Sequence, residues 1–309
     1  MKRIPSIEFY RCLLMFGICL LHAWGQGPHA VGRWGHGLSF CVVGFVAISG
    51  WFGVRFTVSK ILRLVLTAIW CSAVICSLLG MPGDFWRVAK TYWFVWAYLF
   101  MMSFAPIVDA ACEKGSLRRC LLPMTLCVFG WGTLVSNHLT SRFFPHEPGL
   151  APYSGVTLLG VYATVRFLKT GGWLDRLSFR VALSLAVISA VFVFGGVYQY
   201  NSPFCLVLSV SLLVIFSRIS VGEGWFAKGV NLIAPSMFTV YLYHTGPFFG
   251  CIRSWERMMV EQWGIPIFFT WLVMAIFAFA GGVVLDIPRR IIVRICKPTA
   301  NLLYRKLDV

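Results

Sequence analysis

Long apolar stretches separated by short polar turns make up almost the whole chain. Each stretch runs for roughly 17–22 residues, which is the length that a helix needs to cross the hydrocarbon core of a bilayer. The turns MPGD, YQYNSP and GEGW mark clear reversals between stretches. The pattern predicts an all-α, polytopic membrane protein with ten transmembrane helices, at residues 7–25, 37–55, 61–80, 91–109, 118–136, 152–169, 180–198, 203–218, 230–250 and 265–285.

The composition supports this prediction. Of the 309 residues, 59% are hydrophobic and only 12% are charged, whereas a soluble domain carries about 25% charged residues. Most of the 11 cysteines lie within the apolar stretches, and none belongs to a Cys-x-x-Cys motif. We therefore interpret the cysteines as small buried apolar residues, not as disulfides or zinc ligands.

Lysine and arginine are distributed unevenly between the two sides of the predicted bundle. With the amino terminus inside, the inner loops and tails hold 20 of the 27 basic residues, and the outer loops hold six. The positive-inside rule then predicts that both termini are cytoplasmic. The net charge of +16 is explained by this topology, so we expect no nucleic-acid partner. We divide the chain into a transmembrane domain, 1–286, and a basic amphipathic cytoplasmic tail, 287–309, that lies on anionic lipid.

The first apolar stretch, EFYRCLLMFGICLLH, carries the strongest candidates for chemistry. A helix advances 1.5 Å and 100° per residue, so Arg11 and His22 lie on nearly the same face, about 16 Å apart. A charge inside a spanning helix costs about 2.5–3.5 kcal/mol or more and marks a candidate functional site. Histidine is well suited to take a proton from a hydroxyl near neutral pH. Glu8 can pair with Arg11 at i,i+3. The alternative for Glu8 and Arg11 is an ordinary ion pair at the membrane interface, and the alternative for His22 is a structural histidine.

Several segments in order resemble one known family. The run IEFYRCLLMFGICLLH resembles the first-helix signature of the membrane acyltransferase 3 family, and GFVAISGWF and YWFVWAYLFMMSFAPIVD are similar to its second and fourth helices. Lys60-x-x-Arg63 is similar to the basic pair that begins the third helix, where the family more often has two arginines. YNSPFCLVLSVSLLVIF and VYLYHTGPF resemble late helices of stand-alone members that decorate surface polysaccharides. The resemblance covers residues 5–285.

The resemblance implies an O-acyltransferase of the bacterial inner membrane. Its members transfer an acyl group, usually acetyl, from cytoplasmic acyl-CoA to a hydroxyl of a glycan or another acceptor. The catalytic histidine of the family falls on His22, its partner arginine on Arg11, and the acidic residue of the signature on Glu8. We expect acetyl-CoA or another acyl-CoA as the donor substrate, with no permanently bound cofactor and no metal. The expected partners are the glycan acceptor, the lipid bilayer and polysaccharide-assembly proteins.

Four further residues are candidates for binding the donor. Lys60 and Arg63 fall at the cytoplasmic mouth of the predicted bundle, where cations can bind the phosphates of coenzyme A. Ordinary positive-inside anchoring is an equal alternative for both. Ser49 and Gly50 can line a narrow channel for the pantetheine arm, but close packing of two helices is the simpler interpretation of such small residues.

His244 and Tyr243 are candidates on the acceptor side. They lie near the outer end of the ninth predicted span, at a level that His22 also reaches. His244 can therefore stand close to His22, and either support it or contact the acceptor.

Two other classes of function compete with the enzyme. A transporter or flippase for a lipid-linked glycan suits buried charges equally well, but the chain has no sign of the two-half repeat common in transporters. A structural subunit of a polysaccharide-assembly complex would not need Arg11 and His22 at all. The ordered matches to an enzyme family favour the acyltransferase.

Overall fold

The computed structural model describes residues 4–23, 36–114, 153–246 and 248–307. Within these ranges the regular structure is entirely helical, which confirms the predicted all-α class. The expected span at 118–136 lies outside the described residues. The helices are α1 (Pro5–Ala23), α3 (Phe40–Phe52), α4 (Val58–Leu78), α5 (Phe85–Thr91), α6 (Trp93–Glu113), α9 (Tyr153–Thr170), α10 (Trp173–Arg176), α11 (Phe179–Phe194), α12 (Pro203–Arg218), α13 (Trp225–Ile233), α14 (Met237–Thr245), α15 (Phe248–Glu261) and α16 (Ile267–Leu307), with short 3-10 turns at Pro82–Asp84 and Ala234–Ser236.

The helices have the character of a membrane protein. In the described part of the chain, α1, α4, α6 and the first thirty residues of α16 are long and apolar enough to cross a bilayer. Helices α3, α11 and α12 are also apolar but shorter. Large apolar side chains on the outside, such as Val191 (67% exposed) and Phe268 (61% exposed), suit contact with lipid tails. The number of spans and the side on which the termini lie remain predictions.

The ninth predicted span, 230–250, is not a single helix. Residues 225–261 form three helices in succession, α13, α14 and α15, with a 3-10 turn between the first two. Proline explains the first break, because it lacks an N–H donor and restricts the residue before it. Pro235 lies in the 3-10 turn after α13. His244 lies in the last turn of α14, which begins directly after that turn.

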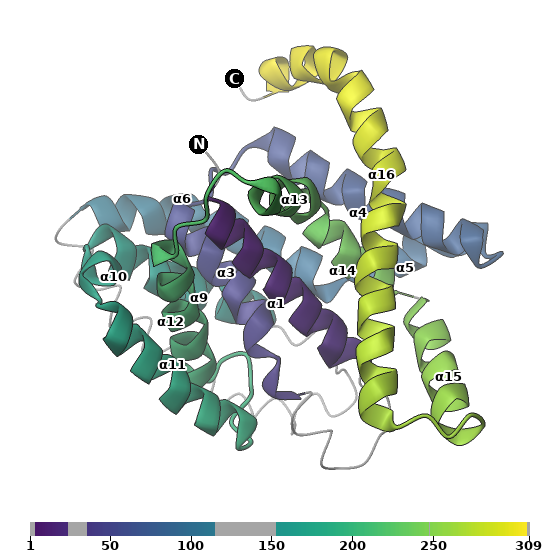
Figure 1. Cartoon of the computed structure of the whole chain (residues 1–309). Helices are drawn as coiled ribbons and strands as arrows, with labels where there is room; N and C mark the ends of the chain where they lie inside the picture. Colours follow the sequence, from purple (N-terminus) through teal and green to yellow (C-terminus); the bar gives the residue numbers. More distant parts are fainter. Residues whose placement is uncertain (1–3, 24–35, 115–152, 247, 308–309) are drawn as a thin grey trace.

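Helix α1 lies at the centre of the bundle, antiparallel to α3 and α16 (Figure 1). The start of α16 lies against the end of α1, where the Trp271 indole N–H donates to the Leu20 carbonyl. Further along, the Phe16 and Phe279 rings meet edge to face at 6.0 Å. The described chain begins and ends on the same side of the bundle (Figure 1).

Small residues allow two other helix pairs to approach closely. A Cβ atom on Gly50 would lie 2.9 Å from the Tyr162 carbonyl oxygen, and one on Gly282 would lie 2.8 Å from the Cα of Val240. Gly50 therefore lies where α3 packs on α9, and Gly282 lies where α16 packs on α14. These contacts fit the packing interpretation of Gly50.

Candidate functional site

His22 and His244 form a hydrogen-bonded pair, although 222 positions separate them in the sequence. His22 Nδ1 lies 2.9 Å from His244 Nε2, and the ring centroids are 5.1 Å apart. His22 lies in the last turn of α1 and is partly buried, whereas His244 is 1% exposed. The other nitrogen of His244, Nδ1, lies 2.6 Å from the carbonyl oxygen of Val240. The expected proximity of the two histidines is therefore present in the structure.

Three helices hold the histidine pair in place. Cys19 of α1 brings its sulfur to 3.9 Å from His244 Nδ1. The rings of Tyr241 of α14 and His244 are perpendicular, with their centroids 6.2 Å apart. The indole of Trp271 ties α16 to the same turn of α1 through Leu20. The pair is thus fixed by packing, which is what a site for oriented proton transfer requires.

The predicted ion pair between Glu8 and Arg11 is also present, at the opposite end of α1. Arg11 Nη1 lies 2.8 Å and 3.1 Å from the two Glu8 carboxylate oxygens. Glu8 is 6% exposed, and the Arg11 side chain is 30% exposed. Within the described residues, Nη1 is the only side-chain nitrogen of Arg11 with a hydrogen bond. Arg11 and His22 both belong to α1 and are eleven residues apart, so about 16 Å of helix separates them.

Ser49 and Arg11 both lie near Tyr98 of α6, a residue that the sequence analysis missed. The Ser49 and Tyr98 hydroxyls are 2.9 Å apart, and Ser49 also donates to the Phe45 carbonyl at 3.3 Å. The Arg11 guanidinium acts electrostatically on the Tyr98 hydroxyl. A single tyrosine within an aromatic apolar stretch gives no periodic or charge signal, so the sequence offered little to single it out.

Lys60 and Arg63 lie on an exposed face at the start of α4. The Lys60 ammonium donates to the Arg55 carbonyl at 2.9 Å, and the Thr57 hydroxyl caps the helix by accepting from the Lys60 backbone N–H at 3.4 Å. The arrangement leaves both cations accessible to an anion in solution. It also suits simple anchoring at a membrane surface, so the binding role of the two residues stays a prediction.

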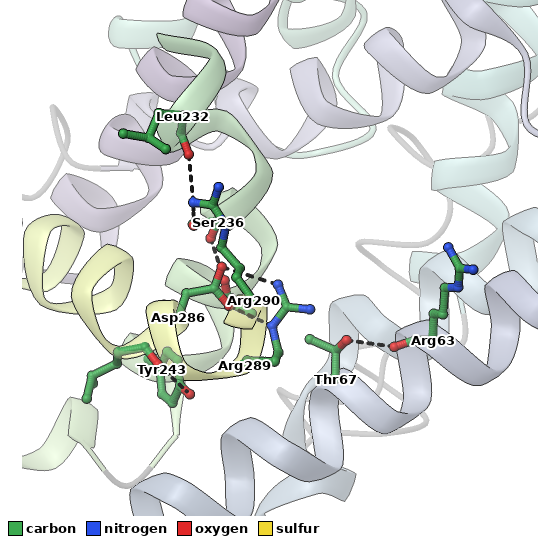
Figure 2. A network of polar contacts seen from close by, with 10 residues as sticks. Arg63, Thr67, Leu232, Ser236, Tyr243, Asp286, Arg289 and Arg290 are labelled. Atoms are coloured by element: carbon green, nitrogen blue, oxygen red, sulfur yellow. Dashed lines mark hydrogen bonds and ion pairs between the residues drawn. The ribbon is translucent and has the colours of Figure 1, made fainter. Parts of the chain in front are cut away.

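Tyr243 belongs to a second polar network, separate from the histidine pair (Figure 2). Its hydroxyl donates to the Leu285 carbonyl of α16 at 3.3 Å. The next residue, Asp286, is fully buried and accepts two hydrogen bonds from Arg289, at 2.6 Å and 3.2 Å. Arg290 donates to the Leu232 carbonyl at 2.7 Å, which ties α16 to α13. The structure thus directs the side chains of Tyr243 and His244 to different partners, and only His244 contacts His22. Helix α16 continues without a break through the expected domain boundary at 286/287.

Another ion pair that the sequence analysis missed links α6 and α9. Arg166 Nε lies 2.9 Å from Asp109 Oδ1, and the Tyr162 hydroxyl donates to the same oxygen at 2.8 Å. Both charged residues lie near the ends of apolar stretches and carry opposite signs. Their opposite charges could have suggested an ion pair, but the sequence does not show which of several charged residues at helix ends are in contact.

An apolar cavity of about 330 Å³ adjoins His244. It lies between α14, α15 and α16, and its lining includes Tyr243, Phe248, Phe277 and Gly281. His244 of the histidine pair is therefore in contact with an apolar cavity.

Comparison with curated proteins and with solved structures finds no match. The model of the acyltransferase 3 family, described as an acyltransferase domain, matches residues 4–287. This range contains every candidate residue discussed above, from Glu8 to Tyr243 and His244. The match confirms the resemblance that the sequence segments indicated, and it shows that the protein is an acyltransferase. The chain therefore belongs to the acyltransferase 3 family.

Proposed function

We propose that this acyltransferase moves an acetyl group from cytoplasmic acyl-CoA to a hydroxyl of a surface or exported polysaccharide, in the inner membrane of a bacterium. One observation carries the proposal: the signature histidine of α1, His22, is held by a hydrogen bond to His244 in a chain of an acyltransferase family. A histidine fixed in this way suits general-base catalysis at a hydroxyl.

The proposed reaction is a direct transfer. The acceptor hydroxyl attacks the thioester carbonyl while His22 takes its proton. The carbon–sulfur bond breaks, the coenzyme A thiolate leaves, and the proton on His22 is returned to the sulfur. The products are the O-acyl glycan and free coenzyme A. No group beyond the two substrates is needed.

Arg11 suits a role in holding the donor. Nη1 of Arg11 contacts both Glu8 oxygens. The remaining guanidinium N–H groups can therefore form hydrogen bonds with a carbonyl or an anionic group of the acyl-CoA. In this proposal Lys60 and Arg63 bind the phosphates of coenzyme A, because they are exposed cations in the first and second turns of α4 and helix N-termini favour anions. Their proposed role depends on α4 beginning at the cytoplasmic surface.

The test measures the acyl content of the host's surface glycan in strains with matched protein levels. His22→Ala should lose about 10²-fold or more of the acylation, since general-base catalysis contributes on that scale. His36→Ala is the matched control, because the His36 ring is exposed and stacks on Tyr198 at 5.0 Å, apart from the pair. Unchanged acylation in His22→Ala would contradict the proposal. Lost glycan export with normal acylation of the remaining glycan would favour a transporter instead.

A further inference from the structure

The hydrogen bonds of His244 show which of its two ring nitrogens carries the proton. A carbonyl oxygen can only accept, so the 2.6 Å contact between His244 Nδ1 and the Val240 carbonyl requires a proton on Nδ1. The Cys19 thiol lies 3.9 Å from the same nitrogen. If the thiol donated there instead, two lone pairs would face each other at 2.6 Å, so we exclude that arrangement. We assign this tautomer from the hydrogen-bond network, because hydrogen positions are inferred and not observed.

The protonation of His244 determines which nitrogen donates in its hydrogen bond with His22. A neutral imidazole has one N–H and one lone pair, so His244 Nε2 carries the lone pair. This nitrogen lies 2.9 Å from His22 Nδ1, which must therefore be the donor. A general base must be neutral before it takes a proton, so this is the state that matters for the reaction. The lone pair of neutral His22 is consequently on Nε2, across the ring from His244.

We infer that His244 is a positioning residue that fixes the reactive tautomer of His22, so that Nε2 of His22 is the atom that takes the proton from the acceptor hydroxyl. This inference rests on the proposed function of His22. When His22 gains the proton, its Nδ1–H bond to His244 becomes charge-assisted and therefore stronger. The division of labour matches that of a catalytic triad, in which a third group holds the base in the correct tautomer.

The same geometry argues against a contact between His244 and the acceptor. Val240 occupies one ring nitrogen of His244 and His22 occupies the other. The ring is 1% exposed, so a sugar hydroxyl would have to break one of these bonds to reach it. His244 thus acts through His22.

Two near-isosteric variants separate this role from a structural one. In His244→Gln the amide lies near the position of Nε2, so its oxygen can still accept from His22. In His244→Asn the amide lies near Nδ1, so it can still donate to Val240 but does not reach His22. The assay supplies radiolabelled acetyl-CoA to membrane vesicles of the host and measures the label in the glycan. We expect His244→Asn to lose about 10²-fold in kcat, with KM for acetyl-CoA unchanged, and His244→Gln to retain activity within about 10-fold of the wild type.

A second measurement reads the tautomer directly. Nitrogen NMR of the full-length protein with isotope-labelled histidine in nanodiscs should show His22 protonated on Nδ1 and unprotonated on Nε2, assigned by its loss in His22→Ala. In His244→Asn the proton should no longer be fixed on Nδ1. Equal activity of the Asn and Gln variants, or a wild-type His22 protonated on Nε2, would overturn the inference. Because the NMR result does not depend on activity, it stands even if a variant fails to fold. Activity retained in His22→Ala would instead overturn the proposed function.

Discussion

Two acid–arginine pairs in which the acid is buried, one in α1 and one in α16, share an i,i+3 spacing but differ in geometry. In α1, a single Arg11 nitrogen contacts both Glu8 oxygens. In α16, Arg289 uses two nitrogens, one for each oxygen of Asp286 (Figure 2). The acid is almost buried in the first pair and wholly buried in the second, with side chains 8% and 0% exposed.

The two pairs differ in contact geometry and in how far the arginine is exposed. We call the forked Asp286–Arg289 contact the closed pair. We call the Glu8–Arg11 contact the open pair, because the Arg11 side chain is 30% exposed against 19% for Arg289. The forked contact of Arg289 satisfies a carboxylate that has no access to water, which is the arrangement a buried charge needs. Its neighbour Arg290 ties α16 to α13 through the Leu232 carbonyl. Both arginines keep N–H groups outside their pair, but those of Arg11 belong to the more exposed side chain. The spacing in the sequence thus identifies both pairs but does not tell which one is structural.

The largest expected effect comes from breaking the closed pair. Asp286→Ala leaves Arg289 without its carboxylate, and removing one partner of a buried pair costs about 3–5 kcal/mol. We expect about 3 kcal/mol here, because the Arg289 side chain is 19% exposed and can turn outward. Chemical unfolding in detergent micelles measures the loss, and acyl transfer per folded molecule should be unchanged.

Asp84→Ala is the matched control for that experiment. Asp84 and Arg87 have the same i,i+3 spacing, but their side chains are 39% and 76% exposed. Such surface pairs contribute about 0–1 kcal/mol, so the control should unfold almost like the wild type. Equal losses in Asp286→Ala and Asp84→Ala would show that burial does not distinguish the two pairs.

A smaller effect, on activity, is expected for the open pair. Arg11→Gln should lower acyl transfer by about 10²-fold, the scale of a misplaced substrate. Its free energy of unfolding should also fall, because Glu8 is only 6% exposed and loses its charged partner. Arg289→Gln should reduce stability in the same way but leave activity per folded molecule unchanged. Kinetics and micelle unfolding on both variants test this contrast. A stable and fully active Arg11→Gln would remove Arg11 from the site.

The smallest expected effect concerns the surroundings of Arg11. Ser49→Ala and Tyr98→Phe each remove one partner of the 2.9 Å hydroxyl contact, and a neutral hydrogen bond contributes about 0.5–1.5 kcal/mol. A double-mutant cycle should therefore give a coupling energy of about 1 kcal/mol in unfolding. A coupling near zero would show that the contact between α3 and α6 adds nothing to the support of Arg11.

Local features of α1 were predictable because they depend on helix geometry alone. The 100° step places Glu8 beside Arg11, and the structure contains that pair. The all-helical class followed from the length of the apolar stretches, and the family followed from ordered segments that the family match confirms. The roles of His22, Arg11, Lys60 and Arg63 stay predictions that the experiments above address.

Contacts between distant segments were predictable only in part. The proximity of His22 and His244 followed from their similar depth, but depth does not give a hydrogen bond or its direction. The Ser49–Tyr98 contact, the Asp109–Arg166 pair and the turn of Tyr243 towards α16 had no unique signal, since many side chains share each depth in a helical bundle. The helix break at Pro235 was visible as a proline, yet the apolar run through it suggested a continuous span.

The sequence by itself determined the all-helical class, the face of α1 that carries Arg11 and His22, and the family to which the chain belongs. These properties depend on residues close together along the chain or on ordered motifs. Only the tertiary structure decided that His244 lies against His22 with its other nitrogen held by Val240. It also decided that Asp286–Arg289 is closed while Glu8–Arg11 stays open. The physical reason is that hydrogen-bond direction and burial are set by how helices rotate and pack against one another, which no spacing within a single helix records.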